Sequence, residues 1–330
     1  MTFAYNQMSL NRCSNERKNK AWLKADFNHE NTLFCLINEG RCFFKLDKIE
    51  PLYLSKAQLL TLTIEQCIFL GKSEQGAIFA VDQHKLRFSD QEALLTLGQW
   101  LPLRQSTALL NAFDAGILAL AKGLVHWHTS HQFCGLCGNL NRSTEAGHAR
   151  KCTECRNMTF PRTDPAVIML VEKMFSDGVP RCLLGRQANW PDGVYSTLAG
   201  FVDPGETLEA AVIREVVEET AIIAENPRYV ASQPWPFPAS VMLGFIAQAN
   251  SADINTSQDS LENAQWFSRA QIANFAVNHS VINTESVQSK IANNSAQNAE
   301  QNTPQYKMSS SDSISSYLIT AWLNKEIGVY

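Results

Sequence analysis

The sequence has 330 residues, of which 45% are hydrophobic and 18% charged, and its formal net charge is −4 at pH 7. This composition is typical of a globular protein, and the length leaves room for two or more domains. The near-neutral charge gives no electrostatic reason to expect nucleic-acid binding as the main activity. No apolar run approaches the roughly 18 residues of a membrane span, and the N-terminal stretch lacks the apolar core of a secretory signal. We therefore expect a cytoplasmic protein without a membrane segment.

Residues 1–103 alternate short apolar runs with polar turns, which predicts a β-rich domain. From residue 103 to 131, apolar residues recur every three or four positions, which predicts a helix that faces a core. The cysteines before this helix are scattered, and we interpret them as buried, inert thiols: Cys13, Cys35, Cys42 and Cys67.

Four further cysteines form two CxxC pairs that are 14 residues apart, as Cys134-x₂-Cys137-x₁₄-Cys152-x₂-Cys155. This spacing can place four thiolates in a tetrahedron, which is the closed geometry of structural zinc. A redox motif and two chance pairs are the alternatives. A zinc ribbon can bind nucleic acid or fasten domains together, and the lack of a cluster of basic and aromatic residues favours fastening.

A continuous apolar run at 166–171 predicts a strand that is buried on both faces. Further strand-like runs lie at 181–185, 195–199, 229–232 and 241–246. The three prolines of residues 233–238 predict a stiffened loop in place of a central strand. Trp235 and Phe237 in this loop are either core residues or a preorganised stacking surface.

Residues 200–222 join a glycine-containing loop to an amphipathic helix with an acidic stripe. Glu215, Glu218 and Glu219 fall on one helical face, where like charges repel by a few tenths of a kcal/mol. Arg214 relieves part of this repulsion, and a hard divalent cation such as Mg²⁺ or Mn²⁺ would relieve the rest. A solvated acidic face is the alternative interpretation.

The C-terminal part begins with a compositional change. Residues 278–312 are rich in Asn, Ser and Gln and almost free of aromatics, which predicts a disordered, low-complexity insertion. An amphipathic pattern over residues 313–325 predicts a final helix.

The motif Gly200-x₅-Glu206-x₇-Arg214-Glu215-x₂-Glu218-Glu219 resembles the Nudix box of hydrolases that act on linked nucleoside diphosphates. With the four-cysteine ribbon before it and the loop Ser232–Ser240 after it, the chain is similar to the NADH pyrophosphatase branch of that family. The resemblance implies an α/β Nudix fold, an α/β/α sandwich with a mixed sheet, preceded by a zinc ribbon and a β-rich N-terminal domain. The implied domains are residues 1–130, 131–161 and 162–330.

The activity implied by the resemblance is metal-dependent hydrolysis of the pyrophosphate of NAD(H) to AMP and nicotinamide mononucleotide. Removal of NAD caps from RNA 5′ ends is an alternative with the same bond chemistry. A third reading is an NAD(H)-binding module with weakened catalysis. The resemblance also implies catalytic Mg²⁺ or Mn²⁺, structural Zn²⁺ and a homodimer.

By this resemblance, Glu215 and Glu219 bind the catalytic metal together with the carbonyl of Ala199, Glu218 completes the cluster, and Arg214 orients the glutamates. The base stays open between one of these carboxylates and a hydroxide on the metal. The implied substrate contacts are spread along the chain: Arg104, Phe160, Gln233, Pro234, Trp235, Pro236, Phe237, Pro238, Ala239, Ser240 and Ser315.

Four positions depart from the pattern of the branch. Ala221 stands where a glycine is usual, which costs on the order of 1 kcal/mol if this residue ends the helix with positive φ. Ser260 stands in place of a further metal-binding glutamate, Gly147 in place of an acidic substrate contact, and Ser315 in place of an alanine.

Overall fold

The computed structural model describes residues 3–257, 260–277 and 306–330. The chain divides into two compact units. Residues 4–163 and 235–239 form the N-terminal unit, and the remaining residues form the C-terminal unit. Within the described residues, no helix combines the length and the apolar character needed to cross a bilayer.

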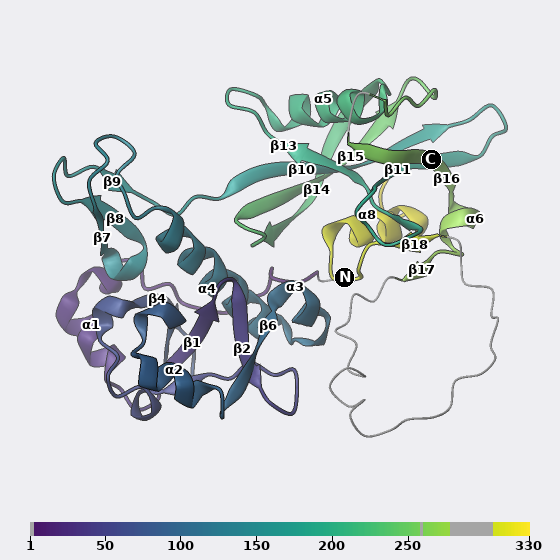
Figure 1. Cartoon of the computed structure of the whole chain (residues 1–330). Coiled ribbons are helices and arrows are strands. Elements are labelled where there is room, and N and C mark those ends of the chain that lie inside the picture. Colours follow the sequence, from purple (N-terminus) through teal and green to yellow (C-terminus); the bar gives the residue numbers. More distant parts are fainter. Residues whose placement is uncertain (1–2, 258–259, 278–305) are drawn as a thin grey trace. The chain divides into compact units, whose positions relative to one another are not determined.

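The C-terminal unit is built on a six-stranded sheet with the order β14-β15-β10-β11-β16, in which β13 also pairs with β10 (Figure 1). The strand β10 lies parallel to β15 and antiparallel to β11 and β13, so the sheet is mixed as expected. The strands of this sheet are β10 (Asp164–Met174), β11 (Pro180–Gln187), β13 (Leu198–Phe201), β14 (Ala224–Trp235), β15 (Ser240–Ala249) and β16 (Leu261–Ser268).

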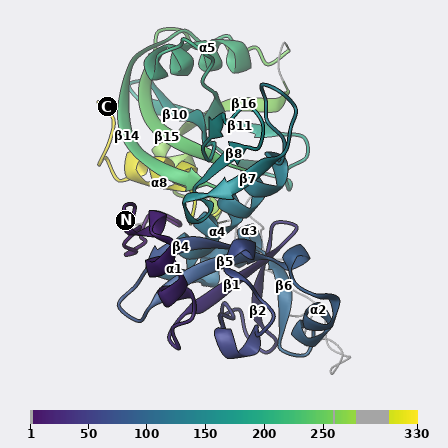
Figure 2. The same ribbon diagram turned by 90° about the vertical axis from the view of Figure 1, so that its left-hand side faces the viewer.

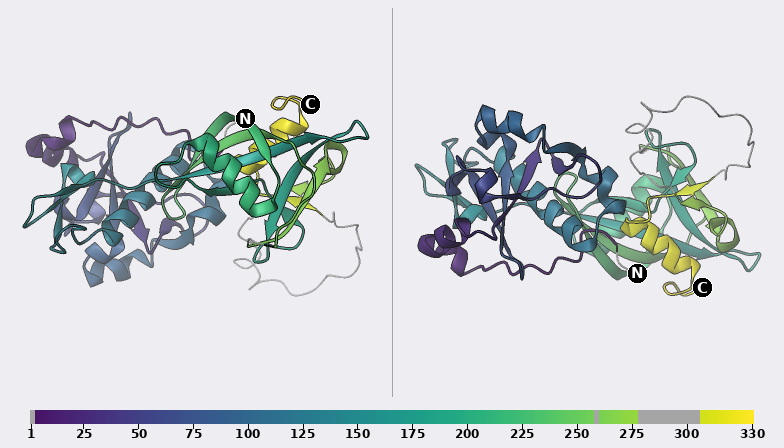
Figure 3. Two further views of the ribbon diagram at one scale, coloured as in Figure 1. Left: turned by 90° about the horizontal axis from the view of Figure 1, so that it is seen from above. Right: turned by 90° about the horizontal axis from the view of Figure 1, so that it is seen from below.

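Two helices cover the two faces of this sheet, α5 (Leu208–Thr220) on one and α8 (Ile314–Leu323) on the other (Figures 1 and 3). Alternate residues of β10 pack on opposite faces of the sheet, because successive side chains on a strand point to opposite faces. Val167 and Met169 pack in the same core as α5, whereas Ile168 packs with α8. The predicted strand buried on both faces and the Nudix α/β/α sandwich are therefore confirmed.

The ends of helix α5 follow from single residues. The Thr207 hydroxyl caps the N-terminus by accepting the backbone N–H of Ala210 at 3.2 Å. The helix ends at Ala221, which adopts the left-handed conformation with φ 59° and ψ 11°. The sequence-based expectation of positive φ at this residue is thus correct, and an alanine there bears a conformational cost that a glycine avoids.

We expect the substitution Ala221→Gly to raise the free energy of unfolding by about 1 kcal/mol, because glycine adopts positive φ without steric cost. This corresponds to a rise in Tm of roughly 2–4 °C, measured by thermal unfolding. Ala210→Gly, in the exposed first turn of the same helix, should instead lower the stability, by about 1 kcal/mol at most. A lower Tm for Ala221→Gly would contradict the strain at this helix end.

The N-terminal unit contains a second six-stranded sheet, with the order β4-β5-β1-β2-β6 and with β3 paired to β1. Its strands are β1 (Leu33–Asn38), β2 (Arg41–Lys45), β3 (Leu54–Ser55), β4 (Cys67–Lys72), β5 (Ala77–Asp82) and β6 (Gly98–Pro102). Its helices are α1 (Lys20–Phe27), α2 (Phe88–Leu94), α3 (Leu103–Ser106) and α4 (Ala112–Ser130). The predicted β-rich character of this region is confirmed.

The helix predicted over residues 103–131 is divided, because α3 ends at Ser106 and α4 begins at Ala112 with Asn111 as its N-cap. The scattered cysteines of this unit are buried, as expected. Burial raises the pKa of the Cys42 thiol to about 12, which agrees with an inert side chain. A three-stranded ribbon sheet completes the unit, with the strands β7 (Asn141–Thr144), β8 (Ala149–Cys152) and β9 (Met158–Thr159).

Two strand predictions need correction. The proline-rich stretch is not a loop from residue 233 onward, because β14 continues to Trp235. It can do so because β14 lies at the edge of the sheet (Figure 2), where a proline without an N–H leaves no ladder partner unpaired. Residues 195–199 do not form one strand, since β12 (Val194–Tyr195) belongs to a small separate sheet with β17 (Ala276–Val277) and β18 (Lys307–Met308).

The predicted low-complexity insertion over residues 278–312 is too long at its C-terminal end. Residues 306–312 have defined structure: β18 pairs with β12 and β17, and the ring of Tyr306 packs against those of Phe267 and Phe275. The aromatic ring supplies a contact that the Asn- and Ser-rich composition around it does not indicate. Residues 278–305 lie outside the described residues. The predicted final helix is confirmed as α8, and the short α6 (Arg269–Ile272) follows β16.

Candidate functional site

The acidic face of α5 is organised by one arginine. Arg214 donates from Nε and Nη2 to the two carboxylate oxygens of Glu206, at 2.9 and 2.8 Å. Its Nη1 donates to Glu215 Oε1 and to Glu218 Oε2, both at 2.8 Å, and Nη2 also donates to the carbonyl of Phe201 at 2.8 Å. A single guanidinium therefore holds three carboxylates and the end of strand β13 together.

The glutamates differ in their exposure. The side chain of Glu218 is 54% exposed, that of Glu215 is 14% exposed, and Glu219 is buried. The Glu215 carboxylate lies against the backbone of Gly200, so closely that a Cβ at Gly200 would collide with it. This close approach explains the glycine at that position, and it places the carboxylate beside the chain segment that carries Ala199.

The hydrogen bonds within this cluster change the proton affinities of its members. The hydrogen bond from Arg214 lowers the pKa of Glu206. Hydrogen bonds to Glu206, and then to Glu215 and Glu218, raise the pKa of Arg214 above its usual value. Both shifts favour the charged forms, so Glu206 and Arg214 are held as an ion pair.

The residues present fit a hard divalent cation. The Glu215 and Glu219 side chains and the Ala199 carbonyl offer only oxygen donors, which Mg²⁺ and Mn²⁺ prefer. The Glu215 carboxylate fills the space over Gly200, so any side chain larger than hydrogen at residue 200 would collide with it. The donor chemistry of these groups is therefore suited to a divalent cation.

The four ribbon cysteines converge as their spacing predicts. The Sγ atoms of Cys134, Cys137, Cys152 and Cys155 all lie within 4.8 Å of one another. The Sγ of Cys134 lies 3.6 Å from that of Cys155, and the Sγ of Cys137 lies 3.4 Å from that of Cys152. Zinc–thiolate bonds of about 2.3 Å in a tetrahedron require sulfur–sulfur separations of roughly 3.8 Å. The cluster therefore fits a structural zinc ion.

Backbone amides favour the thiolate form of two of the four cysteines, whereas hydrogen bonds with the neighbouring thiols raise the pKa of Cys155 to about 12. The backbone N–H of Asn139, followed by its side chain, lowers the pKa of Cys137 to about 6. The backbone N–H of Leu136 approaches Cys134 Sγ at 3.4 Å and lowers the pKa of that thiol. Thiolates at neutral pH are the form that binds zinc.

The predicted stacking residues of the proline-rich loop lie within the N-terminal unit, where two cations contact them. The guanidinium of Arg104 lies over the Trp235 ring at 4.8 Å from its centroid. Lys122 of α4 donates to the carbonyl of Pro236 at 2.5 Å, and its Nζ lies 4.9 Å from the centroid of the Phe237 ring. These contacts fix the loop at its backbone and at both aromatic rings.

Tyr5 adds an edge-to-face contact to Phe237, with ring centroids 6.1 Å apart. Trp235 and Phe237 also meet edge to face, at 5.2 Å. The rest of the predicted loop contacts, Pro238 and Ala239, belong to the same unit. The ring of Phe160, which follows β9, is exposed.

Other predicted substrate contacts have structural partners in the C-terminal unit. The buried side chain of Gln233, within β14, accepts the backbone N–H of Ile314 at 2.7 Å and donates to the carbonyl of Asp312 at 2.8 Å. It thereby binds the N-terminus of α8. Ser240 is buried at the start of β15.

Two of the positions that depart from the branch have packing roles. The Ser315 hydroxyl lies 2.7 Å from that of Ser196 and accepts the backbone N–H of Thr197 at 3.1 Å. It thereby holds the chain segment directly before β13. Gly147 has φ +96°, and a Cβ there would collide with Ile68. Ser260 precedes β16.

Sequence reasoning missed two residues that the structure ties to these groups. Glu206 was recognised as part of the motif without a role, and it is the main partner of Arg214. The only indication of this contact in the sequence was the position of Glu206, eight residues before Arg214. Lys122 had no signal, because its contacts are 114 residues away along the chain.

Comparisons with known proteins agree with this fold and this acidic helix. A NUDIX domain model matches residues 162–284, and a model for a NADH pyrophosphatase-like rudimentary NUDIX domain matches residues 31–127. The human NAD-capped RNA hydrolase NUDT12 is 32% identical over 322 residues, which cover 81% of this chain and 66% of that protein. The mouse mitochondrial NAD(P)H pyrophosphatase NUDT13 is 40% identical over 222 residues, which cover 63% of this chain and 61% of that protein.

The NAD-capped RNA hydrolase NudC of Chromobacterium violaceum is 38% identical over 199 residues, which cover 60% of this chain and 71% of that protein. The chain belongs to the Nudix hydrolases, in the group that joins a NADH pyrophosphatase-like domain to a NUDIX domain. It spans 66% of the length of the human relative and 61% of the mouse relative, so it covers less than two thirds of each.

Proposed function

We propose that this protein hydrolyses the pyrophosphate bond of NAD(H), releasing AMP and nicotinamide mononucleotide, with Mg²⁺ or Mn²⁺ as the catalytic metal and Zn²⁺ as a structural ion. The observation that carries the proposal is the cluster on α5, in which Arg214 binds three carboxylates beside the Gly200 backbone. A charged diphosphate requires such a concentration of oxygen ligands for cations.

In this proposal, Glu215, Glu219 and the carbonyl of Ala199 hold the metal, and Glu218 tunes the cluster from its exposed position. The metal, when bound, neutralises negative charge on the diphosphate. Arg214 orients Glu215 and Glu218 through one nitrogen, which fixes their spacing before substrate arrives. An ionised carboxylate of this face serves as the base for the attacking water.

The choice of a dinucleotide is supported by the proline-rich loop and by the similarity to the mouse NAD(P)H pyrophosphatase NUDT13. Trp235 and Phe237 offer aromatic surfaces whose backbone is stiffened by proline and fixed by Lys122, so stacking on a base costs little conformational entropy. We assign the remaining substrate contacts to Arg104, Phe160, Gln233–Ser240 and Ser315.

The test is to incubate the purified protein with NADH and either Mg²⁺ or Mn²⁺ and to follow AMP by chromatography. Release of equimolar AMP and reduced nicotinamide mononucleotide is expected. Absence of turnover with both metals, in a zinc-loaded and folded preparation, would refute the proposal.

Removal of NAD caps from RNA 5′ ends is a second candidate, which the similarity to the human and Chromobacterium NAD-capped RNA hydrolases favours. The two candidates differ in whether the RNA body contributes to binding. Comparing kcat/KM for NAD-capped RNA with that for free NADH separates them, since a preference for capped RNA would make decapping the main activity.

We expect Lys122→Met to raise the KM for NADH about tenfold while leaving kcat nearly unchanged, because a charged hydrogen bond to the loop backbone is lost. Methionine keeps the apolar stem of the lysine, so Tm should change little. Lys20→Met, at an exposed position of α1, is the matched control. Equal KM values for the two variants would contradict a positioning role for Lys122.

We also propose a homodimer and a cytoplasmic location for this protein, and domain boundaries at residues 1–130, 131–161 and 162–330. The homodimer and the domain boundaries rest on the family resemblance. Light scattering coupled to size exclusion tests the dimer, since a mass near 36.8 kDa would indicate a monomer.

A further inference from the structure

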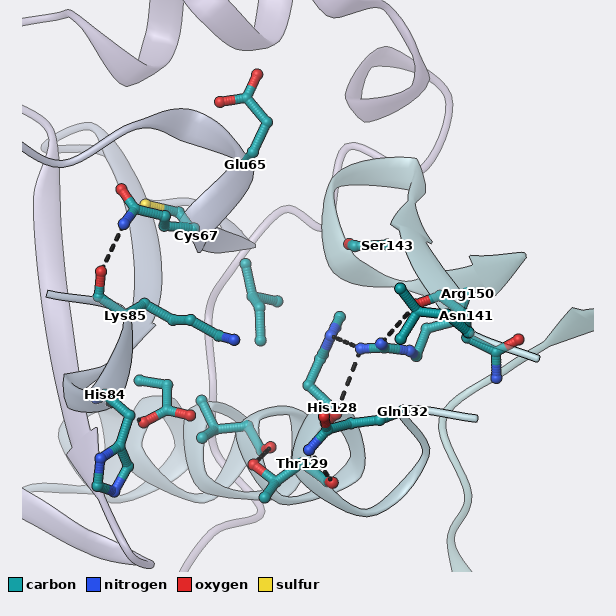
Figure 4. Close-up of a pocket in the computed structure, with 15 residues that line it drawn as sticks. Glu65, Cys67, His84, Lys85, His128, Thr129, Gln132, Asn141, Ser143 and Arg150 are labelled. Atoms are coloured by element: carbon teal, nitrogen blue, oxygen red, sulfur yellow. Dashed lines mark hydrogen bonds between the residues drawn. The ribbon is translucent and has the colours of Figure 1, made fainter. Parts of the chain in front are cut away.

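A cavity of about 500 Å³ lies within the N-terminal unit (Figure 4). It is bounded by strand β4, by the turn after β5, by the last turns of α4 and by the ribbon strands β7 and β8. The ribbon is attached to this unit by two histidines: His128 Nε2 lies 2.7 Å from the carbonyl of Gly147, and His148 Nε2 lies 2.6 Å from that of Phe69. The volume of the cavity is within the range of small-molecule sites.

One wall of the cavity carries a buried guanidinium whose hydrogen-bond partners are all neutral. Arg150 is only 8% exposed, and it donates from Nη1 to His128 Nδ1 at 2.8 Å and from Nη2 to the carbonyl of Asn141 at 2.8 Å. Its buried Nε has no hydrogen-bond partner. Among the residues described, no carboxylate forms an ion pair with Arg150, so its charge is left uncompensated.

His128 does not add negative charge to this wall. Burial lowers the pKa of His128 to about 4, and the positive charges of Arg150 and Lys85 contribute in the same direction. The ring is therefore neutral at pH 7, with Nδ1 accepting from Arg150 and Nε2 donating to Gly147.

A second cation faces the same space. The side chain of Lys85 extends into the cavity toward the side where Arg150 and His128 lie (Figure 4). In the described part of the chain, Lys85 forms no ion pair within 4.0 Å. The Glu65 carboxylate points away from both cations in this view, and the Asp82 carboxylate accepts the backbone N–H of His84 at 3.0 Å. The cavity is thus lined by two cations and two carboxylates, and among the described residues neither cation forms an ion pair within 4.0 Å.

We propose that this cavity binds a small phosphorylated metabolite, with its phosphate between Lys85 and Arg150 and its hydroxyl groups toward the polar walls. A phosphate monoester carries about −1.5 to −2 charges at pH 7, which matches two cations, whereas a carboxylate carries one. Gln132, Thr129 and Ser143 line the same cavity and offer hydrogen bonds to a sugar. The site is independent of the proposed hydrolase activity.

The experiment is calorimetric titration of the zinc-loaded full chain with ribose 5-phosphate, inorganic phosphate and ribonate, the last having a carboxylate and no phosphate. Wild-type protein and Lys20→Met should bind ribose 5-phosphate with one-to-one stoichiometry. Lys85→Met should bind it about tenfold more weakly, and Lys85→Glu more weakly still. Lys85 is exposed, so these variants should fold normally.

Equal affinity of wild type, Lys20→Met and Lys85→Met would overturn the proposal, as would absence of binding at millimolar ribose 5-phosphate. Ribonate binding as tightly as ribose 5-phosphate would exclude phosphate as the recognised group. If inorganic phosphate bound as tightly as ribose 5-phosphate, the polar walls would not contribute to recognition of the sugar. NADH hydrolysis, measured in parallel, should be equal in Lys85→Met and wild type, so failure of one proposal leaves the other testable.

Discussion

Replacing Glu219 by glutamine is expected to lower kcat for NADH hydrolysis by about 10³-fold, equivalent to ~4 kcal/mol of transition-state stabilisation. The substitution keeps the shape of a side chain that is only 8% exposed and removes the negative charge needed to hold a divalent cation. Steady-state rates should be measured over a wide range of Mg²⁺ and Mn²⁺ concentrations, together with Tm.

Glu209→Gln is the matched control, because Glu209 lies on the exposed first turn of the same helix. It should keep the wild-type rate and metal dependence. If Glu219→Gln turned over NADH at the wild-type rate at saturating metal, Glu219 would not be a metal ligand.

Removal of zinc is expected to produce the largest loss of stability. Cys152→Ser should lower the zinc content from one ion per chain to near zero and destabilise the N-terminal unit by about 3 kcal/mol or more. For a unit of this size, that corresponds to a fall in Tm of roughly 6–12 °C. Zinc is measured by plasma mass spectrometry, and Tm by differential scanning fluorimetry with and without a chelator.

Cys182→Ser provides the comparison, since Cys182 is fully buried in the core of the other unit and lies outside the cluster. It should lose stability through an unpaired buried hydroxyl while retaining its zinc. A full zinc content in Cys152→Ser would disprove the four-cysteine site.

The sequence was informative wherever local spacing determines geometry. Two CxxC pairs predicted a cysteine cluster, because each pair forms its own tight turn and only one long-range contact is needed. The apolar run in β10 predicted a strand buried on both faces, because only a strand between two layers needs apolar residues on both sides. The four-residue offset between Arg214 and Glu218 predicted their contact on one helical face.

The sequence failed where a residue's role depends on a distant partner. The extent of β14 is decided by its position at the sheet edge, which no local pattern reports. The hydrogen bond from the backbone of Ile314 to the Gln233 amide, which holds the start of α8 81 residues further along, is likewise not indicated by any local pattern. The positive φ of Ala221 could be anticipated only through the resemblance, since alanine itself gives no such signal.

The pairing of β17 with β18 has a consequence for how this family can vary in length. Ala276 lies opposite Lys307, and Val277 opposite Met308, so the two strands that flank residues 278–305 are hydrogen-bonded neighbours. When the anchor points of a connection are already adjacent, each doubling of its length costs only about 0.6 kcal/mol of closure entropy. Evolution can therefore lengthen or shorten the chain at this position at little thermodynamic cost, and a protein engineer could graft a foreign segment or a fluorescent tag there.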